Sequence, residues 1–295
     1  MATNYDSLVR ELAHLKVEYQ GESSWYEHGS FMIWLVGTLK PDTFVELGSH
    51  YGYSYFAACQ SIKSNGLQTK AFAIDTWQGD EHAGFYSNEV YEIVNQVNTE
   101  KYSSFSKLLR MTFDQGLAEF ADTSIDLLHI DGLHTYDAVA SDFNSWKRKL
   151  KDGALVLFHD IHEHRDDFEV NRFWNELKKE YKTFEFLHEH GLGVLKIGTK
   201  TTPVDFLFLS EMQQEELNLL RYIFRSSGLM TSIESQLRDK DKIIETYYSN
   251  WHKEIEISAR HEDAIRVLNT IIDNIKNSLS WKLTKPIRRM KSSKD

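Results

Sequence analysis

The sequence predicts an α/β fold, with a doubly wound, mostly parallel sheet, a closing antiparallel hairpin and a long C-terminal helical coiled coil. Two observations lead to this prediction. Up to about residue 200, short runs rich in β-branched and aromatic residues alternate with helical stretches. After Pro203 the pattern changes, and residues 231–279 contain neither Gly nor Pro.

Five apolar runs are predicted strands. Each is mostly continuous rather than alternating in apolarity, as parallel strands covered on both faces require. They are residues 43–47, 71–74, 108–113, 125–130 and 154–158, and helical patterns occupy residues 52–64, 86–101, 115–121, 136–150 and 167–181. This alternation makes βαβ units, so the predicted fold is Rossmann-like. Residues 184–187 and 193–197 form the closing hairpin, and Pro41 separates an N-terminal helical segment from the first strand.

The C-terminal stretch carries apolar residues near a period of 3.5, from Ile233 to Leu279, among charged residues. This period predicts a long helix in a coiled coil, and a pair of amphipathic helices folded back on the first domain is the alternative. The predicted divisions are a first domain at 1–200, a connector at 201–230, the coiled-coil helix at 231–279 and a basic tail at 280–295. Six of the last fourteen residues are basic, which suits an anionic membrane surface, an acidic partner or a solvated end.

Composition excludes several classes of protein. With 44 acidic and 34 basic side chains, the formal net charge of -10 argues against a general nucleic-acid binder. The 41% of hydrophobic residues supply enough apolar surface for a core. The single Cys59 excludes a disulfide framework and a multi-cysteine zinc site. No apolar run or N-terminal pattern indicates a membrane span or signal peptide, so we expect a cytoplasmic protein, with peripheral binding to the inner face of the membrane as an option.

A glycine-containing turn follows the first predicted strand. Gly48 and Gly52 would let the backbone turn tightly beside a ligand, and Glu46 could accept a hydrogen bond from an amine. The spacing is not the G-x-G-x-x-G fingerprint, and no P-loop is present. The second strand ends at Asp75, the position expected to bind ribose hydroxyls. A nucleoside-type ligand is predicted, with NAD and S-adenosylmethionine both open.

Acidic residues and histidines follow the fourth and fifth predicted strands. Asp131 and His134 come after one strand, and His159 and Asp160 after the other. Because the ends of neighbouring parallel strands meet at one edge of a sheet, Asp131 and Asp160 could share a divalent cation. The alternative is that the aspartates are helix caps and the histidines ordinary loop residues.

Four strings carry a resemblance to a known family: V-E-L-G-S-H-Y-G-Y-S, I-D-T-W-Q-G-D-E-H-A-G-F-Y, I-D-G-L-H-T-Y-D-A-V and L-x-x-G-A-L-V-L-F-H-D-I. Residues 43–160 resemble class I S-adenosylmethionine-dependent methyltransferases, in the branch of macrocin O-methyltransferase and cephalosporin hydroxylase-like proteins. The resemblance implies S-adenosyl-L-methionine as the cofactor. The implied cofactor-binding residues are Glu46, Gly48, Ser49, Tyr51, Gly52 and Ser54 around the methionine part, Asp75 and Trp77 after the second strand, Asp114 and Gln115 near adenine, and Asp131.

The resemblance also implies a metal ligand at Asp131 and a general base at His134. Our hypothesis is that Asp160 and His159, at the end of the fifth strand, complete the metal site. Relatives similar to catechol O-methyltransferase have two oxygen donors at the fifth strand, where this chain has His159 and Asp160. A histidine ligand softens the site, so Mg²⁺, Mn²⁺ and no metal all stay open. The motif from Trp77 to Tyr86 is predicted either to form a lid or acceptor wall, or to be a packed loop with Trp77 against adenine.

The predicted activity is methyl transfer to a sugar hydroxyl in cell-surface glycan synthesis. The tail from Ser278 to Arg289 resembles a short sequence found at the ends of bacterial surface-polysaccharide proteins. The predicted partners are a sugar or glycan acceptor, a homo-oligomer or hetero-assembly formed through the coiled coil, and an anionic membrane surface bound by the tail. The alternatives are a methyltransferase for a small natural product and a cofactor-binding scaffold without catalysis.

Overall fold

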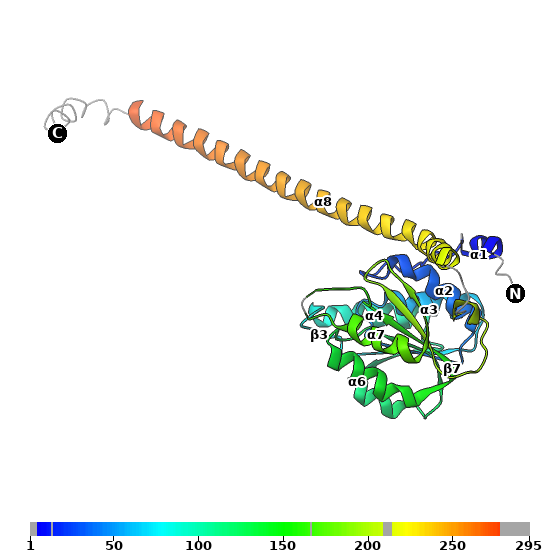
Figure 1. Cartoon of the computed structure of the whole chain (residues 1–295). Helices are drawn as coiled ribbons and strands as arrows, with labels where there is room; N and C mark the ends of the chain where they lie inside the picture. Colours follow the sequence, from blue (N-terminus) through cyan, green and yellow to red (C-terminus); the bar gives the residue numbers. More distant parts are fainter. Residues whose placement is uncertain (1–4, 13, 166, 209–213, 278–295) are drawn as a thin grey trace. The chain divides into compact units, whose positions relative to one another are not determined.

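The computed structural model describes residues 5–12, 14–165, 167–208 and 214–277 (Figure 1). The chain divides into two compact units, Met1–Ser235 and Gln236–Asp295. The first unit holds the sheet and every residue of the candidate site. Within the described residues, the second unit is the continuation of one long helix.

A seven-stranded sheet lies at the centre of the first unit. Its strands are β1 (Thr43–Leu47), β2 (Lys70–Asp75), β5 (Ser106–Arg110), β6 (Ile125–Ile130), β7 (Leu150–His159), β8 (Lys182–Phe186) and β9 (Leu192–Lys196). Their spatial order is β5-β2-β1-β6-β7-β9-β8. The first five are parallel, whereas β9 pairs antiparallel with both β7 and β8. The predicted fold is confirmed, and the strand order reverses between β1 and β6, where open α/β sheets bind ligands.

The first unit also contains helices and short 3₁₀ turns. They are α1 (Tyr5–Leu12), η1 (Tyr26–His28), α2 (Gly29–Leu39), α3 (Tyr53–Ser64), α4 (Asn88–Lys101), α5 (Phe113–Gly116), η2 (Leu117–Glu119), α6 (Tyr136–Trp146), η3 (Lys147–Lys149), α7 (Val170–Glu180) and η4 (Asp205–Phe208). A two-stranded ribbon of β3 (Gly79–Asp80) and β4 (Gly84–Phe85) was not predicted; it lies within the motif from Trp77 to Tyr86.

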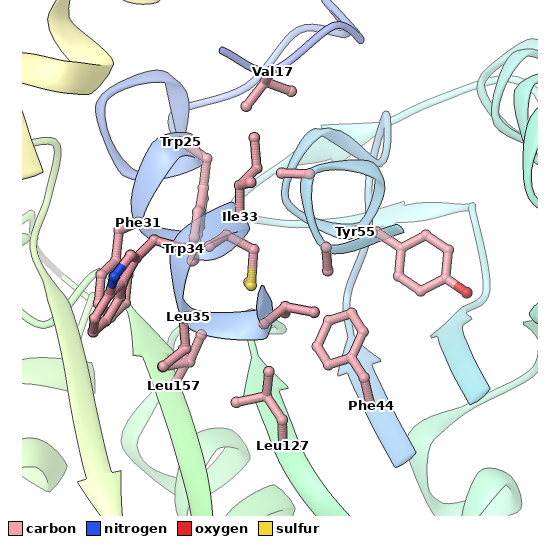
Figure 2. Packing of buried hydrophobic residues seen from close by; sticks show 14 of the residues in the cluster. Val17, Trp25, Phe31, Ile33, Trp34, Leu35, Phe44, Tyr55, Leu127 and Leu157 are labelled. Carbon is pink, nitrogen blue, oxygen red and sulfur yellow. The ribbon is translucent and has the colours of Figure 1, made fainter. Parts of the chain in front are cut away.

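Two hydrophobic clusters cover the two faces of the sheet, and neighbouring residues of one strand enter different clusters. On β1, Phe44 packs with α2 and α3, whereas Val45 packs with α6 and α7. Figure 2 shows the first cluster, in which Phe44, Leu127 and Leu157 of three strands face the residues of α2. Burial on both faces explains why the strands read as continuous apolar runs.

Two predicted boundaries are wrong for a local reason. The strand expected at 108–113 ends at Arg110, because Thr112 begins α5 with a capping box in which its side chain accepts from the Gln115 amide. The helix expected from residue 86 begins at Asn88, after the N-cap Ser87. Both caps are hydroxyl side chains that accept the otherwise unpaired amides of a first helical turn.

The C-terminal helix α8 (Gln214–Asn277) has 64 residues and is uninterrupted, so the alternative of two separate helices is wrong over the described residues. It begins inside the segment predicted as a connector (201–230), because Leu220 and Phe224 are buried in the first cluster. Beyond Ser235 it exposes large apolar side chains: Leu237, Ile243, Ile244, Tyr247, Tyr248, Trp251, Ile257, Ile265, Val267, Leu268 and Ile271. The coiled coil stays a prediction, and the basic tail at 280–295 lies outside the described residues.

No helix within the described ranges combines the length and the apolarity that crossing a bilayer requires.

Candidate active site

A cavity of about 700 Å³ lies beyond the carboxyl ends of the parallel strands. Nine predicted site residues line it: Gly48, Ser49, Ser54, Asp75, Asp114, Asp131, His134, His159 and Asp160. They come from the ends of β1, β2, β6 and β7, from the loop after β6, and from α3 and α5. The sheet therefore brings together residues that are more than 100 positions apart in the chain, at the point where its strand order reverses.

The turn after β1 depends on its glycines. Gly48 has a φ of 83°, and a Cβ there would lie 2.0 Å from the Asp131 carbonyl oxygen. Gly52 has a φ of 80° and forms the N-cap of α3. Only glycine adopts both conformations without strain, so these residues let the first loop pass directly against the end of β6.

Asp75, the last residue of β2, fixes this turn. One carboxylate oxygen accepts hydrogen bonds from the amides of Ser49 (2.8 Å) and His50 (3.1 Å), and the other accepts from the Trp77 amide (2.6 Å). A carboxylate has about four lone-pair positions, so one stays free for a ligand. Asp75 thus both shapes the cavity and lines it, as the ribose role predicted for it requires.

Five predicted cofactor residues do not line the cavity: Glu46, Tyr51, Gly52, Trp77 and Gln115. Glu46 is fully buried, with one oxygen 2.7 Å from the Ser49 hydroxyl and the other 2.8 Å from His129 Nδ1. Trp77 is also buried, and its indole nitrogen donates to the His50 carbonyl. These residues support the wall from behind.

The motif from Trp77 to Tyr86 is divided between two roles. Trp77 packs against Tyr91 in the interior, whereas Gly79, Asp80, His82 and Tyr86 line the cavity. This motif therefore lines the cavity except at Trp77, and the lid or acceptor wall stays a prediction.

Two carboxylates line the cavity near α5 and α6. Asp114 was predicted near adenine, and Asp142 of α6 was not predicted at all. Burial first and the charge of Asp114 second raise the pKa of Asp142 to about 7. A carboxyl group that is hard to ionise therefore faces this end of the cavity.

Asp131, His134 and Asp160 form the chemical centre. Each offers one ligand atom, and these atoms lie within 4.8 Å of one another. His134 Nε2 is 2.8 Å from Asp160 Oδ2 and 3.8 Å from Asp131 Oδ1. Asp160 has a φ of 59°, a left-handed conformation that is uncommon outside glycine.

His159 completes a charge balance around the two aspartates. Its Nδ1 is 3.2 Å from Asp160 Oδ2 and 3.5 Å from Asp131 Oδ1. Burial disfavours the charged imidazoles, but the two carboxylates outweigh it, raising the pKa of His134 to about 9 and that of His159 well above its usual range. Burial works against the carboxylates as well, yet the histidines, His159 first, hold the pKa values of Asp131 and Asp160 low. Two negative charges thus lie between two positive ones.

This geometry changes the roles predicted for the two histidines. The predicted metal set was Asp131, His159 and Asp160, with His134 as a separate base. Among the residues that the structure describes, the three with ligand geometry are Asp131, His134 and Asp160. His159 approaches the same carboxylates, but it is almost fully buried. His134 is the more accessible imidazole, and it stacks on Phe168 with ring centroids 4.5 Å apart.

Several lining residues were not predicted, and most of them come from segments without a recognisable motif. They are Glu22, Ser23, Ser24 and Trp25 before η1, His50, His82, Asp142, Arg165, Phe168 and His190. A signal existed for His50, inside the string V-E-L-G-S-H-Y-G-Y-S, and for His82, inside the motif from Trp77 to Tyr86. The others are brought to the cavity by tertiary packing, which no local sequence pattern records.

Residues 45–161 match the protein family described as "Methyltransferase domain". The match covers less than half of the chain, so the similarity to this family is established for residues 45–161 alone. The match begins in β1 and ends just after Asp160, so it includes the glycine turn, Asp75 and the Asp131–His134–Asp160 cluster. The match supports the predicted methyltransferase.

Two relatives have no described activity. The chain is 46% identical over 177 residues to the uncharacterized protein y4gI of Sinorhizobium fredii, a match that covers 60% of this chain and 19% of that protein. It is 28% identical over 173 residues to an uncharacterized protein of Acanthamoeba polyphaga mimivirus, covering 54% of this chain and 72% of the other. The chain therefore spans about a fifth of the length of the first relative.

Solved structures of methyltransferases are similar at low identity. The SAH-bound methyltransferase PaMTH1 of Podospora anserina is 14% identical, with a TM-score of 0.46 over 66% of this chain and 88% of that one. The O-methyltransferase TomG of Streptomyces achromogenes, in complex with SAM, is 13% identical, with a TM-score of 0.46 over 68% and 92% of the two chains.

Proposed function

We propose that the protein is an S-adenosyl-L-methionine-dependent O-methyltransferase that methylates a sugar hydroxyl in bacterial surface glycan synthesis, assisted by a divalent cation. One observation carries the proposal. A single cavity joins the glycine turn at Gly48, the acidic strand end at Asp75 and the Asp131–His134–Asp160 cluster. Methyl transfer from a sulfonium is an in-line displacement, so donor and acceptor must be aligned in one enclosed space.

The cavity has the charge that this cofactor needs. S-Adenosylmethionine carries a sulfonium and an ammonium, and carboxylates that line a cleft concentrate cationic ligands. The turn at Gly48 and the free lone-pair position of Asp75 would bind the methionine and ribose parts, and the end near Asp114 would bind adenine. Ser23 and Ser24 add hydroxyls to the wall.

Asp131, His134 and Asp160 would hold the cation, since two carboxylate oxygens and an imidazole nitrogen suit Mn²⁺ or Mg²⁺. A bound cation lowers the pKa of an acceptor hydroxyl and fixes its oxygen. The chain's own residues hold the cluster: Phe168 stacks on His134, and His159 contacts the two carboxylates from the buried side.

His134 has two roles that exclude each other at Nε2, cation ligand and general base. Its raised pKa means that without a cation the ring is protonated and cannot accept the acceptor proton. We therefore assign Nε2 to the cation, and the acceptor hydroxyl, whose pKa the cation would lower, would release its proton to solvent as the methyl group leaves the sulfonium and S-adenosylhomocysteine remains. In the part of the chain that the structure describes, Nδ1 is buried and has no hydrogen-bond partner, so it does not compete for this role.

A sugar acceptor is supported by further residues that line the cavity. Tyr86 offers a partly exposed aromatic ring, whereas Trp25 and Tyr53 line the wall but are almost fully buried. Glu22 and Asp80 offer carboxylates. Aromatic faces suit the C–H faces of a sugar ring, and carboxylates accept hydrogen bonds from its hydroxyls. A small natural product would use the same aromatic wall, and it is the alternative acceptor.

The test has two steps. Calorimetry with S-adenosylmethionine, with and without Mn²⁺, comes first, and an absence of binding would remove the enzymatic proposals and leave the scaffold. Methyl transfer to glycan oligomers, nucleotide sugars and small phenols then identifies the acceptor, and transfer to phenols alone would support the natural-product alternative.

His134→Gln separates the two roles of this residue. As a ligand, its loss should weaken Mn²⁺ binding about 10- to 100-fold; as a base, it should cost about 10²-fold in turnover with Mn²⁺ binding unchanged. His162→Gln is the matched control, because His162 lies two residues beyond Asp160 and does not line the cavity. Near-normal turnover of His134→Gln would contradict both roles.

We also propose that α8 assembles the protein through its second unit. The large apolar side chains that it exposes beyond Ser235 recur at heptad spacing, as in Leu237, Ile244 and Trp251. An isolated helix gains little stability from propensity alone, so a partner helix would cover this stripe. Binding of the tail to an anionic membrane is a further proposal, supported only by the sequence of residues 280–295.

A further inference from the structure

A strained turn borders the part of the cavity where we propose that the acceptor binds, which we call its acceptor end. Three consecutive residues between β8 and β9 have positive φ: Glu189 (43°), His190 (65°) and Gly191 (86°). Glycine adopts this conformation freely, but the other two do so at a cost and persist only where their surroundings hold them. The turn is therefore fixed by contacts outside itself.

This turn reaches the chemical centre in two ways. His190 lines the cavity, and its Nδ1 is 2.5 Å from a carboxylate oxygen of Glu163. The His190 carbonyl also accepts a hydrogen bond from the amide of His162 (2.7 Å), in the segment that follows Asp160. The turn thus supports the backbone beyond Asp160 and supplies a side chain to the cavity.

Two hydrogen bonds connect the turn to α8 through Glu27. A carboxylate oxygen of Glu189 accepts from the Glu27 amide at 2.6 Å. The Glu27 side chain, itself nearly buried, accepts from Arg225 Nε of α8 at 2.8 Å. Gly228, one helical turn further along, lies so close to Glu27 that a Cβ would be 2.2 Å from its carbonyl oxygen. The first part of α8 therefore fits closely against η1, and η1 holds the turn.

We propose that Arg225 is a positioning residue: through Glu27 and Glu189 it holds the strained turn, and the turn sets His190 and the segment after Asp160 for the acceptor. This inference rests on the proposed function for its catalytic consequence. It gives α8 a role in the methyltransferase unit that is separate from assembly. Arg225 contacts Glu27, at the acceptor end, and does not line the cavity.

The decisive variant is Arg225→Met, which keeps the aliphatic stem and removes the charge. Lys16→Met is the matched control, because Lys16 also joins α8 by an exposed ion pair, to Glu234 at 2.6 Å, and lines no part of the cavity. If these ion pairs only help α8 to pack, the two substitutions should have equal effects on the turn. Arg225→Lys restores a cation and should recover most of the wild-type behaviour.

Hydrogen exchange is the readout that does not depend on the enzymatic proposal. In Arg225→Met, the amides of Gly191 and His162 should exchange about two- to fivefold faster than in the wild type, the range expected for the loss of one partly exposed ion pair. Lys16→Met should leave both unchanged. Unchanged exchange in Arg225→Met, or equal acceleration in both variants, would overturn the proposal. If Arg225→Met does not fold, Glu27→Gln removes the same ion pair from the other side.

Kinetics then test the catalytic consequence. In Arg225→Met the KM for the acceptor should rise about two- to fivefold, while the affinity for S-adenosylmethionine stays within about twofold of the wild type, because the turn borders the acceptor end. A parallel loss of cofactor affinity would overturn the positioning role. If the wild type itself transfers no methyl group, the proposed function fails, and the exchange data still decide whether Arg225 holds the turn.

Discussion

Asp142 gives the sharpest quantitative prediction. Its carboxylate lines the cavity, and within the described residues no group donates a hydrogen bond to it. Burial raises its pKa from 3.8 to about 7, with the charge of Asp114 adding to the effect. A folded-state pKa above the unfolded value means that the associated stability is complete below about pH 4 and is lost as the pH rises through 7.

The magnitude follows from this shift. Over the full pH range, the shift of about three pKa units lowers the free energy of unfolding by about 4 kcal/mol. About 2.5 kcal/mol of this loss falls between pH 5 and pH 8. Asp142→Asn cannot ionise, so it should gain stability relative to the wild type by up to that amount between these two pH values. For a chain of this size, the gain corresponds to about 4 °C in Tm.

The assay is urea unfolding of the cofactor-free protein at pH 5 and pH 8, for the wild type, Asp142→Asn and the control Asp137→Asn. Asp137 lies in the first turn of the same helix and is exposed, so its substitution should show no gain that grows with pH. If Asp142→Asn is no more stable than the wild type at pH 8, the carboxylate has a partner in solution and the reasoning is refuted.

Three further predictions follow from other contacts. Gly48→Ala should cost more than about 3 kcal/mol in urea unfolding, because the new methyl would meet the Asp131 carbonyl oxygen; a loss below about 1 kcal/mol would mean that the turn relaxes. Glu46→Gln should cost about 2–4 kcal/mol by disrupting the buried contact with His129, yet leave cofactor affinity nearly unchanged while the protein is folded, as calorimetry would show. The full chain with Leu237→Lys and Ile244→Lys should be monomeric by light scattering if α8 forms a coiled coil, and an unchanged mass would contradict assembly through this stripe.

The fold could be predicted from the sequence because burial on both faces leaves a local signature. Phe44 and Val45 enter opposite clusters, and both must be apolar. The closing hairpin and the α/β alternation were predicted for similar reasons. Predicted ends of helices and strands were wrong where a single hydroxyl side chain caps a helix. Thr112 is an example, because its capping box begins a helix at the end of an apolar run.

The site was predictable only where residues follow strand ends. Asp75, Asp131 and Asp160 lie at such ends, and the topology brings them together. Glu46 shows the limit: its place in the motif suggests a ligand contact, but the register of β1 against β6 pairs it with His129, and the two side chains bond to each other in the interior. Register is a long-range property, so no local pattern reports it. Asp142 and His190 were missed because tertiary packing, rather than a local pattern, brings them to the cavity.

The charge arrangement at the centre leads to a last prediction, on cation binding. Asp131 and Asp160 are held ionised, and their charges are balanced by the protonated His134 and His159. A divalent cation at the cluster takes over the balancing charge, so His134 must lose its proton to bind it. Because its pKa is raised to about 9, this proton opposes binding at every pH below 9.

The apparent dissociation constant for Mn²⁺ should therefore fall about tenfold for each pH unit between pH 6 and pH 8, measured by electron paramagnetic resonance of free Mn²⁺. His134→Gln has no such proton, so its binding should be weaker and nearly independent of pH over the same range. A flat profile in the wild type would mean that His134 is not a ligand, and the general-base role would then be the one that remains. The same imidazole cannot serve both purposes through Nε2, and the slope of this profile decides between them.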